Sequence, residues 1–183
     1  MIGKEIHHLI SISMVLIAVA LCGSCDLQGQ GPPAKADAAA VLMPTKGHTV
    51  SGVVAFYKVS HGVRIIADIS ELSPGAHGIH IHEFGDCRAG DASSAGGHFN
   101  PSGNLHGAPD AEDRHAGDLG NIVADESGAA TLDIVVPSLS LEGEHAIIGR
   151  SVIVHAHEDD GTTQPSGGAG ARLACGTIGL AGK

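Results

Sequence analysis

The chain has 183 residues, a length that suits one domain, and its 27 Gly and 2% aromatic residues disfavour a helical bundle or a platform for stacking bases or sugars. Ten Lys and Arg against 20 Asp and Glu give a net charge of −10, which argues against a nucleic-acid-binding protein, because such a protein needs a basic face. The 13 His, against one Tyr and three Phe, point instead to metal binding.

The N-terminus has the pattern of an export signal. Residues 9–21 are mostly apolar, too few to span a bilayer of about 30 Å comfortably, and typical of a signal peptide. We expect a signal peptide over 1–25 and a location in the periplasm or cell envelope. Cys25 follows Gly23-Ser24 and resembles the lipid-accepting cysteine of a bacterial lipoprotein, although Cys22 replaces the usual aliphatic residue, so the mature chain is either tethered to the membrane through Cys25 or free of it.

Cysteine usage fits the same compartment. Cys22-Gly-Ser-Cys25 matches a redox or zinc motif, but no pattern of strand and helix surrounds it, so the leader interpretation is preferred. Cys87 and Cys175 remain, an even number in an exported chain, and are expected to form a disulfide; two buried free thiols are the alternative.

Past the leader, the pattern predicts an all-β domain. Residues 26–40 lack periodicity and read as a flexible linker, with the folded domain over 41–183. Apolar and polar residues alternate over 63–70 and 131–136, as in half-buried strands. Further strand-like runs occupy 49–59, 145–155 and 173–180, and no helical apolar stripe is present. An antiparallel sandwich or barrel is predicted.

Residues 82–121 show neither the apolar period of a strand nor that of a helix. So long a segment without periodicity is unusual in a compact domain unless it is functional or disordered. The segment contains His98, His106, His115, Asp118 and Cys87, all residues that can bind a metal or form a disulfide. We expect metal binding and a disulfide to order it, since a disordered insertion would not explain why these residues are concentrated there.

A second group of candidate ligands lies on strands. His80 and His82 are two residues apart, so in a strand they share one face with Cα atoms about 6.5 Å apart and can reach one ion. His155 and His157 are spaced in the same way, and spacing leaves either as a candidate. The chain offers more candidate ligand side chains than one tetrahedral ion can bind, which favours two adjacent metal ions. Imidazole with carboxylate suits zinc, and imidazoles with an open position suit copper.

Four stretches resemble the signature sequences of copper/zinc superoxide dismutase, in the order found in that family. They are Gly78–Asp86, Ser94–Pro101, Arg114–Asn121 and Gly170–Gly176. The similarity extends from about Val41 to Ala181. It implies an eight-stranded Greek-key sandwich or barrel with long metal-binding and channel loops, and a homodimer.

The resemblance also assigns the site residues. It implies one copper per subunit, bound by His80, His82, His98 and His155, and one zinc, bound by His98, His106, His115 and Asp118. Arg172 would stand beside the open copper position, Asp159 would link His80 to His106, and Cys87 would pair with Cys175. His77 would be structural, His157 would not be a ligand, and His48, His61 and His145 would be solvated.

The implied activity is dismutation of the small anion superoxide to oxygen and hydrogen peroxide. Copper would be reduced and reoxidised in turn, His98 would release copper and carry a proton, and zinc would have no redox role. Two alternatives use the same donors: an envelope protein that stores copper or zinc without turnover, and a zinc hydrolase. Asp118 disfavours the hydrolase, because it would fill the fourth zinc position.

Overall fold

The structure is a computed structural model that describes residues 35–182. The predicted signal peptide, Cys25 and the linker as far as residue 34 lie outside the described residues. No helix in the described part has the length and hydropathy needed to cross a membrane. Within it the secondary structure consists of a single 3-10 turn, η1 (Ser93–Ala95), and nine strands. These are β1 (Ala38–Pro44), β2 (Ser51–Val59), β3 (Gly62–Ser70), β4 (Gly75–His82), β5 (Asp118–Ala124), β6 (Ala130–Val136), β7 (Ser151–His155), β8 (Arg172–Thr177) and β9 (Gly179–Leu180).

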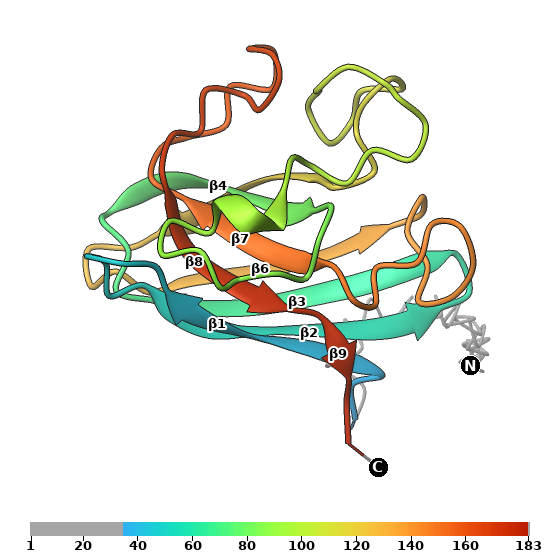
Figure 1. Cartoon of the computed structure of the whole chain (residues 1–183), viewed down its shortest axis with the longest axis horizontal. Coiled ribbons are helices and arrows are strands. Elements are labelled where there is room, and N and C mark those ends of the chain that lie inside the picture. The colour runs from blue at the N-terminus through green and yellow to red at the C-terminus, as the bar shows by residue number, and fades with distance from the viewer. Residues whose placement is uncertain (1–34, 183) are drawn as a thin grey trace, which may run out of the picture. The chain divides into compact units, whose positions relative to one another are not determined.

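Eight antiparallel strands close into a barrel (Figure 1). The order is β2-β3-β6-β5-β4-β7-β8-β1, and the pairing of β1 with β2 closes the sheet. The two-residue β9 adds to the edge of β1. Because β3 pairs with β6 and β4 pairs with β7, the connections cross between non-sequential strands, as in a Greek key. The predicted all-β barrel is confirmed.

Alternating apolar residues fill the barrel. In β3, Val63, Ile65, Ala67 and Ile69 are buried while the residues between them face outward, which is the period of two that the sequence predicts. Phe56 from β2 is fully buried in the same core. With so few aromatic residues, branched aliphatic side chains supply most of the buried core, and this packed interior gives the strands that carry the candidate ligands a rigid base.

Three local features differ from the sequence expectations. Only Ser151–His155 of the run 145–155 forms a strand, because a turn ending at Gly149, with φ of 82°, precedes it. Strand β1 begins at Ala38 inside the predicted linker, since small Ala residues bury without giving a strong apolar signal. Strand β5 occupies 118–124 and begins within the segment that lacks periodicity; its first two residues are both buried because Asp118 faces the candidate ligand histidines and Leu119 packs in the apolar core.

Two long connections carry most of the remaining site residues. Residues 83–117 join β4 to β5, and residues 156–171 join β7 to β8; residues 100–117 and 156–171 rise from the same side of the barrel (Figure 1). The predicted disulfide between Cys87 and Cys175 is present, with Cα atoms 5.8 Å apart, and fastens the first connection to β8. It therefore anchors a segment that has little regular structure of its own.

Candidate dinuclear metal site

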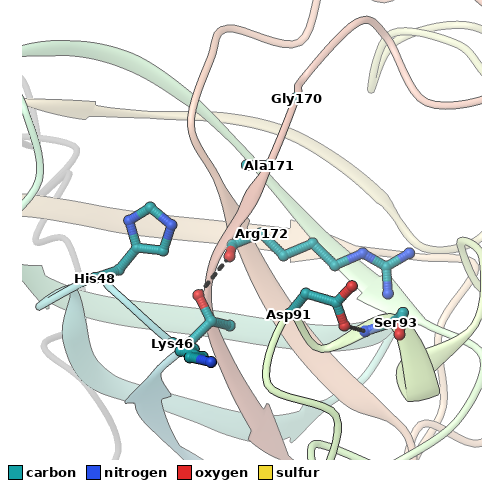
Figure 2. A pocket seen from close by; sticks show the side chains of 8 residues that line it. Lys46, His48, Asp91, Ser93, Gly170, Ala171 and Arg172 are labelled. Atoms are coloured by element: carbon teal, nitrogen blue, oxygen red, sulfur yellow. Dashed lines mark hydrogen bonds between the residues drawn. The ribbon is translucent and has the colours of Figure 1, made fainter.

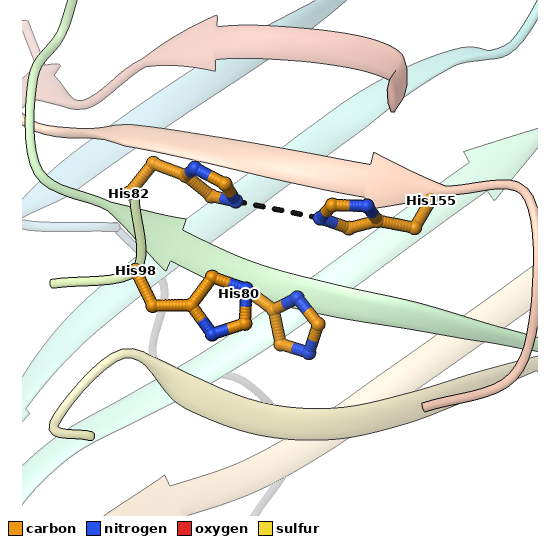
Figure 3. A group of neighbouring side chains, drawn as sticks. All are labelled: His80, His82, His98 and His155. Carbon is orange, nitrogen blue, oxygen red and sulfur yellow. Dashed lines mark hydrogen bonds between the residues drawn. The ribbon is translucent and has the colours of Figure 1, made fainter. Parts of the chain in front are cut away.

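The first group of donors combines two strands and a loop. His80 and His82 come from β4, His155 ends the neighbouring β7, and His98 lies in the loop, where it pairs with His82 in an isolated bridge. One nitrogen of each of the four rings lies within 4.8 Å of the others. Figure 3 shows the four rings converging. Nε2 of His82 lies 3.3 Å from Nε2 of His155.

The second group gathers around one carboxylate oxygen. Asp118 Oδ1 lies 2.7 Å from His98 Nδ1, 3.1 Å from His106 Nδ1 and 3.2 Å from His115 Nδ1. In a tetrahedral zinc site with bonds of about 2.0 Å, the ligand atoms are about 3.3 Å from one another. The backbone N–H groups of Gly107 and His115 donate to Asp118 Oδ2, which leaves Oδ1 for the cluster. The donor set fits zinc.

Unpartnered nitrogens test whether metals belong here. His80 Nδ1, His98 Nε2, His106 Nδ1 and His115 Nδ1 are buried and make no hydrogen bond, although Asp118 Oδ1 lies close to the last two. Leaving such an atom unsatisfied costs about 1–3 kcal/mol. Four of them within two adjacent groups are explained if each donates its lone pair to an ion, so the residues present fit a pair of bound metals.

His98 belongs to both groups. Its Nδ1 faces Asp118 in the second group, so its unpartnered Nε2, on the other side of the ring, is left for the first. Its ring centroid lies 4.1 Å from that of His80 and 5.4 Å from that of His106. One imidazole is therefore placed to join two ions.

Hydrogen bonds fix which nitrogen each ring presents. Asp159 accepts from His80 Nε2 through Oδ2 at 2.7 Å and from His106 Nε2 through Oδ1 at 2.9 Å. His82 Nδ1 donates to Gly96 O, and His155 Nδ1 donates to Gly170 O. Since the acceptors are carboxylate or carbonyl oxygens, the protons lie on the outer nitrogens, and the inner ones keep their lone pairs for a metal.

The protonation states agree with ligation. Burial lowers the pKa of His80 to about 4, of His82 to about 2 and of His155 to about 3, so these rings are neutral at pH 7. Burial would raise the pKa of Asp118, but hydrogen bonds from His98 and from the Gly107 N–H outweigh it and hold that pKa below its ordinary value. Three rings of the first group thus offer lone pairs, and the second group contributes a negative charge.

An open cavity of about 340 Å³ leads to the first group. Its lining includes His82, His98 and His155, together with Arg172 and Ser166. The Arg172 guanidinium is half-buried and donates through Nη1 to Ala92 O at 2.6 Å and through Nη2 to Gly96 O at 2.7 Å. Burial lowers the pKa of Arg172, but an arginine stays charged at neutral pH. A fixed cation therefore borders the open side of the group.

The remaining histidines lie outside the two groups. His77 is buried; its Nδ1 donates to His155 O and its Nε2 accepts from the Ser73 hydroxyl, so it supports the strands as expected. His48, His61 and His157 are exposed. His145 is partly exposed and donates through Nδ1 to Ser138 O, and it lies outside both groups.

Supporting residues that the sequence did not single out complete the site. Asn121 Nδ2 donates to Asp159 O, and Asn121 Oδ1 accepts from the Asp159 N–H, both at 2.8 Å. Gly167 lies so close to the same carboxylate that a Cβ there would overlap Asp159 Oδ1. Asn121 was visible only as the last residue of a motif, and Gly167 gave no signal in a chain with 27 Gly.

A Greek-key barrel with two imidazole-rich donor groups that share one histidine defines a candidate dinuclear metalloprotein. The family model described as "Copper/zinc superoxide dismutase (SODC)" matches residues 50–178. The chain belongs to this family and is therefore an oxidoreductase, a superoxide dismutase. It is also similar to the solved structure titled "Crystal Structure Analysis of the clock protein EA4", with 41% identity and a TM-score of 0.73, over 82% of this chain and 99% of that chain.

Proposed function

We propose that this chain dismutes superoxide at a copper ion held by the first donor group, with a zinc ion held by the second. The proposal rests on the position of His98, because its two ring nitrogens face the two donor groups. Bound copper would supply one-electron redox chemistry and bound zinc a fixed positive charge without redox chemistry. The net reaction oxidises one superoxide to oxygen and reduces a second, with two protons, to hydrogen peroxide.

His98 is the residue placed to handle a proton. Its Nε2 is buried and has no hydrogen-bond partner, and the ring borders the cavity through which superoxide would enter. Whenever Nε2 is free of a metal, it can hold a proton and pass it to a reduced oxygen species in the cavity. The Nδ1 side stays in place against Asp118, so the ring need not turn between cycles.

Arg172 would attract and orient the substrate. The whole chain carries a net charge of −10, which repels a small anion at long range. A half-buried guanidinium fixed by two carbonyl oxygens gives a local positive potential at the cavity, where low-dielectric walls concentrate its field. The positive charge at this entrance suits a small anion.

Metal analysis with a dismutation assay tests the proposal. The purified protein loaded with both metals should contain one copper and one zinc per chain, dismute superoxide, and lose its copper EPR signal on reduction. The His98→Gln variant should lose zinc affinity and turnover together. A wild-type protein that binds both ions without turnover would instead be a metal store, and ester hydrolysis by the zinc-only form would indicate a hydrolase.

We further propose that the chain forms a homodimer through an apolar patch of β1 and β2. Val41 is 62% exposed and pairs in register with Val53, which is 46% exposed, and Met43 continues the same face of β1. Contiguous exposed apolar residues favour an interface. Sedimentation should give a dimer mass for the wild type and a monomer mass for Val53→Glu, while Val135→Glu, at an exposed position of β6, should stay dimeric. A monomeric wild type would refute the proposal.

Export to the periplasm or envelope is also part of the proposal. The apolar run at 9–21 and the Cys87–Cys175 disulfide support it, because disulfides persist in oxidising compartments. Mass spectrometry of the mature N-terminus should find a chain that starts at or near Cys25. An added lipid mass on Cys25 would establish the membrane tether, an unmodified residue would remove it, and an intact Met1 would refute export.

A further inference from the structure

Arg172 borders a second cavity besides the copper channel. This cavity, of about 360 Å³, is lined by Thr45, Lys46, His48, Asp91 and Ser93, along with Arg172 and its neighbours Gly170 and Ala171 (Figure 2). It lies between the β1–β2 connection and the loop that the disulfide anchors. Arg172 is thus accessible from two sides, and a charge in the second cavity acts on the same guanidinium that faces the substrate.

Asp91 is the acidic residue of this second cavity, and local bonds fix its position. Its Oδ1 accepts from the Ser93 N–H at 2.9 Å. A dashed line marks this bond in Figure 2. The next residue, Ala92, has a left-handed φ of 58°, and its carbonyl accepts from Arg172 Nη1. One short segment therefore both binds the guanidinium and holds a carboxylate on the same cavity wall.

The charges of Asp91 and Arg172 act on each other. Burial lowers the pKa of Arg172, and the negative charge of Asp91 opposes that change. The pKa of Asp91 is lowered first by its hydrogen bonds with Ser93 and also by the positive charge of Arg172. The bond to Ser93 requires only an acceptor oxygen, which an Asn would supply equally well. The negative charge of Asp91 is therefore not needed for the local fold, so its effect on Arg172 can be separated from any effect on the fold.

We propose that Asp91 sets the anion selectivity of the copper channel by partly neutralising Arg172 from the second cavity. The carboxylate weakens the attraction of every anion to the guanidinium, and by Coulomb's law the loss grows with the anion's charge. A monovalent anion such as superoxide is disfavoured less than a polyvalent one such as phosphate. The inference deepens the proposed function and rests on it, because it assigns a selectivity residue to the same channel.

Anion titrations of the protein loaded with copper and zinc test the proposal. The Asp91→Asn variant keeps an acceptor for Ser93, and Glu126→Gln in the β5–β6 turn removes one negative charge elsewhere. Azide binding is followed by the copper absorption band, and inorganic phosphate binding at pH 8 by its competition with azide. Compared with the wild type, Asp91→Asn should bind azide about two- to fivefold more tightly. Its affinity for phosphate should rise by a larger factor, and both increases in affinity should become smaller at high salt.

Each contrary outcome is decisive. Equal affinities in Asp91→Asn and Glu126→Gln would show that Asp91 acts only through net charge and would overturn the proposal. Weaker azide binding in Asp91→Asn would also overturn it, because Asp91 would then serve to position Arg172. Asp91→Ser, whose hydroxyl can also accept from Ser93, should reproduce the gain if charge is the cause. A wild type without turnover would refute the proposed function, yet these affinities would still be measured.

Discussion

Substituting Gly167 by Ala should weaken zinc binding although Gly167 offers no ligand. Gly167 has φ of 65°, and a Cβ there would overlap Asp159 Oδ1 and come within 2.7 Å of His106 Nε2. The neighbouring Gly168 has nearly the same φ, 64°, but its Cβ would find only Asp160 Oδ2, at 3.6 Å. Gly168→Ala is therefore a matched control that carries the backbone cost, about 1 kcal/mol, without the collision.

The magnitude follows from the bonds that the collision disturbs. Asp159 Oδ1 accepts from His106 Nε2 at 2.9 Å and from the Gly161 N–H at 2.8 Å. A hydrogen bond to a charged group contributes about 1.5–3 kcal/mol. If the methyl group displaces the carboxylate from His106, the ring loses its orientation and zinc affinity should fall by about 2 kcal/mol, or roughly 30-fold, within the range usual for residues that orient metal ligands.

Competition with a chromophoric chelator measures the zinc dissociation constants of the two variants and the wild type. Gly167→Ala should show the roughly 30-fold loss, and Gly168→Ala should stay within about threefold of the wild type. Equal losses in the two variants would refute the reasoning, because the effect would then come from backbone strain alone. An unchanged Gly167→Ala would show that the Asp159 carboxylate does not orient His106.

Three further predictions concern substrate attraction, the disulfide and pH. Arg172→Ala should slow dismutation about 10- to 100-fold with both metals retained, as metal analysis and stopped-flow kinetics would show, and an unchanged rate would remove its role. Replacing both disulfide cysteines by Ala should lower the unfolding free energy of the metal-free protein by about 4–5 kcal/mol, because the bridge spans 88 residues; urea midpoints measure this, and a loss under about 1 kcal/mol would contradict it. Three buried histidines have pKa values below the ordinary 6.5, so the unfolded chain binds more protons beneath that pH. The unfolding free energy of the metal-free protein should therefore fall by up to about 1.4 kcal/mol per pH unit for each of these histidines as the pH drops from about 6.5 towards 4. Thermal unfolding at several pH values measures this. A stability that does not change with pH would contradict the burial of His80, His82 and His155.

Periodicity predicted the strands with one face inward and one outward. Residues 63–70 and 131–136 alternate because each strand has a buried and an exposed face, and both form strands. Strand β7 is buried at all five positions and gives no alternation, so its boundary with the turn before it could not be placed. Strand β5 gives no periodic signal at its start for a related reason, since Asp118 is buried among the candidate ligand histidines and not against the apolar core.

The candidate site was predicted by donor chemistry and by resemblance, and less by spacing. The two-residue interval between His80 and His82 is short enough for strand geometry to decide, and the structure brings the two side chains together. Spacing left His155 and His157 open, and only the resemblance chose between them. The nearness of Gly167 to Asp159, and of Asp91 to Arg172, depends on how two loops fold over the barrel. No local pattern in the sequence encodes those contacts.

The Asp159 carboxylate has a consequence for how the site fills with metal. Because it holds His80 with one oxygen and His106 with the other, an ion that immobilises either ring also orders the carboxylate for its neighbour. A metal ion bound to one donor group then raises the metal affinity of the other group, and thermodynamic linkage makes this effect equal in both directions. Loading should accordingly be cooperative, with half-filled molecules scarcer than independent binding would give.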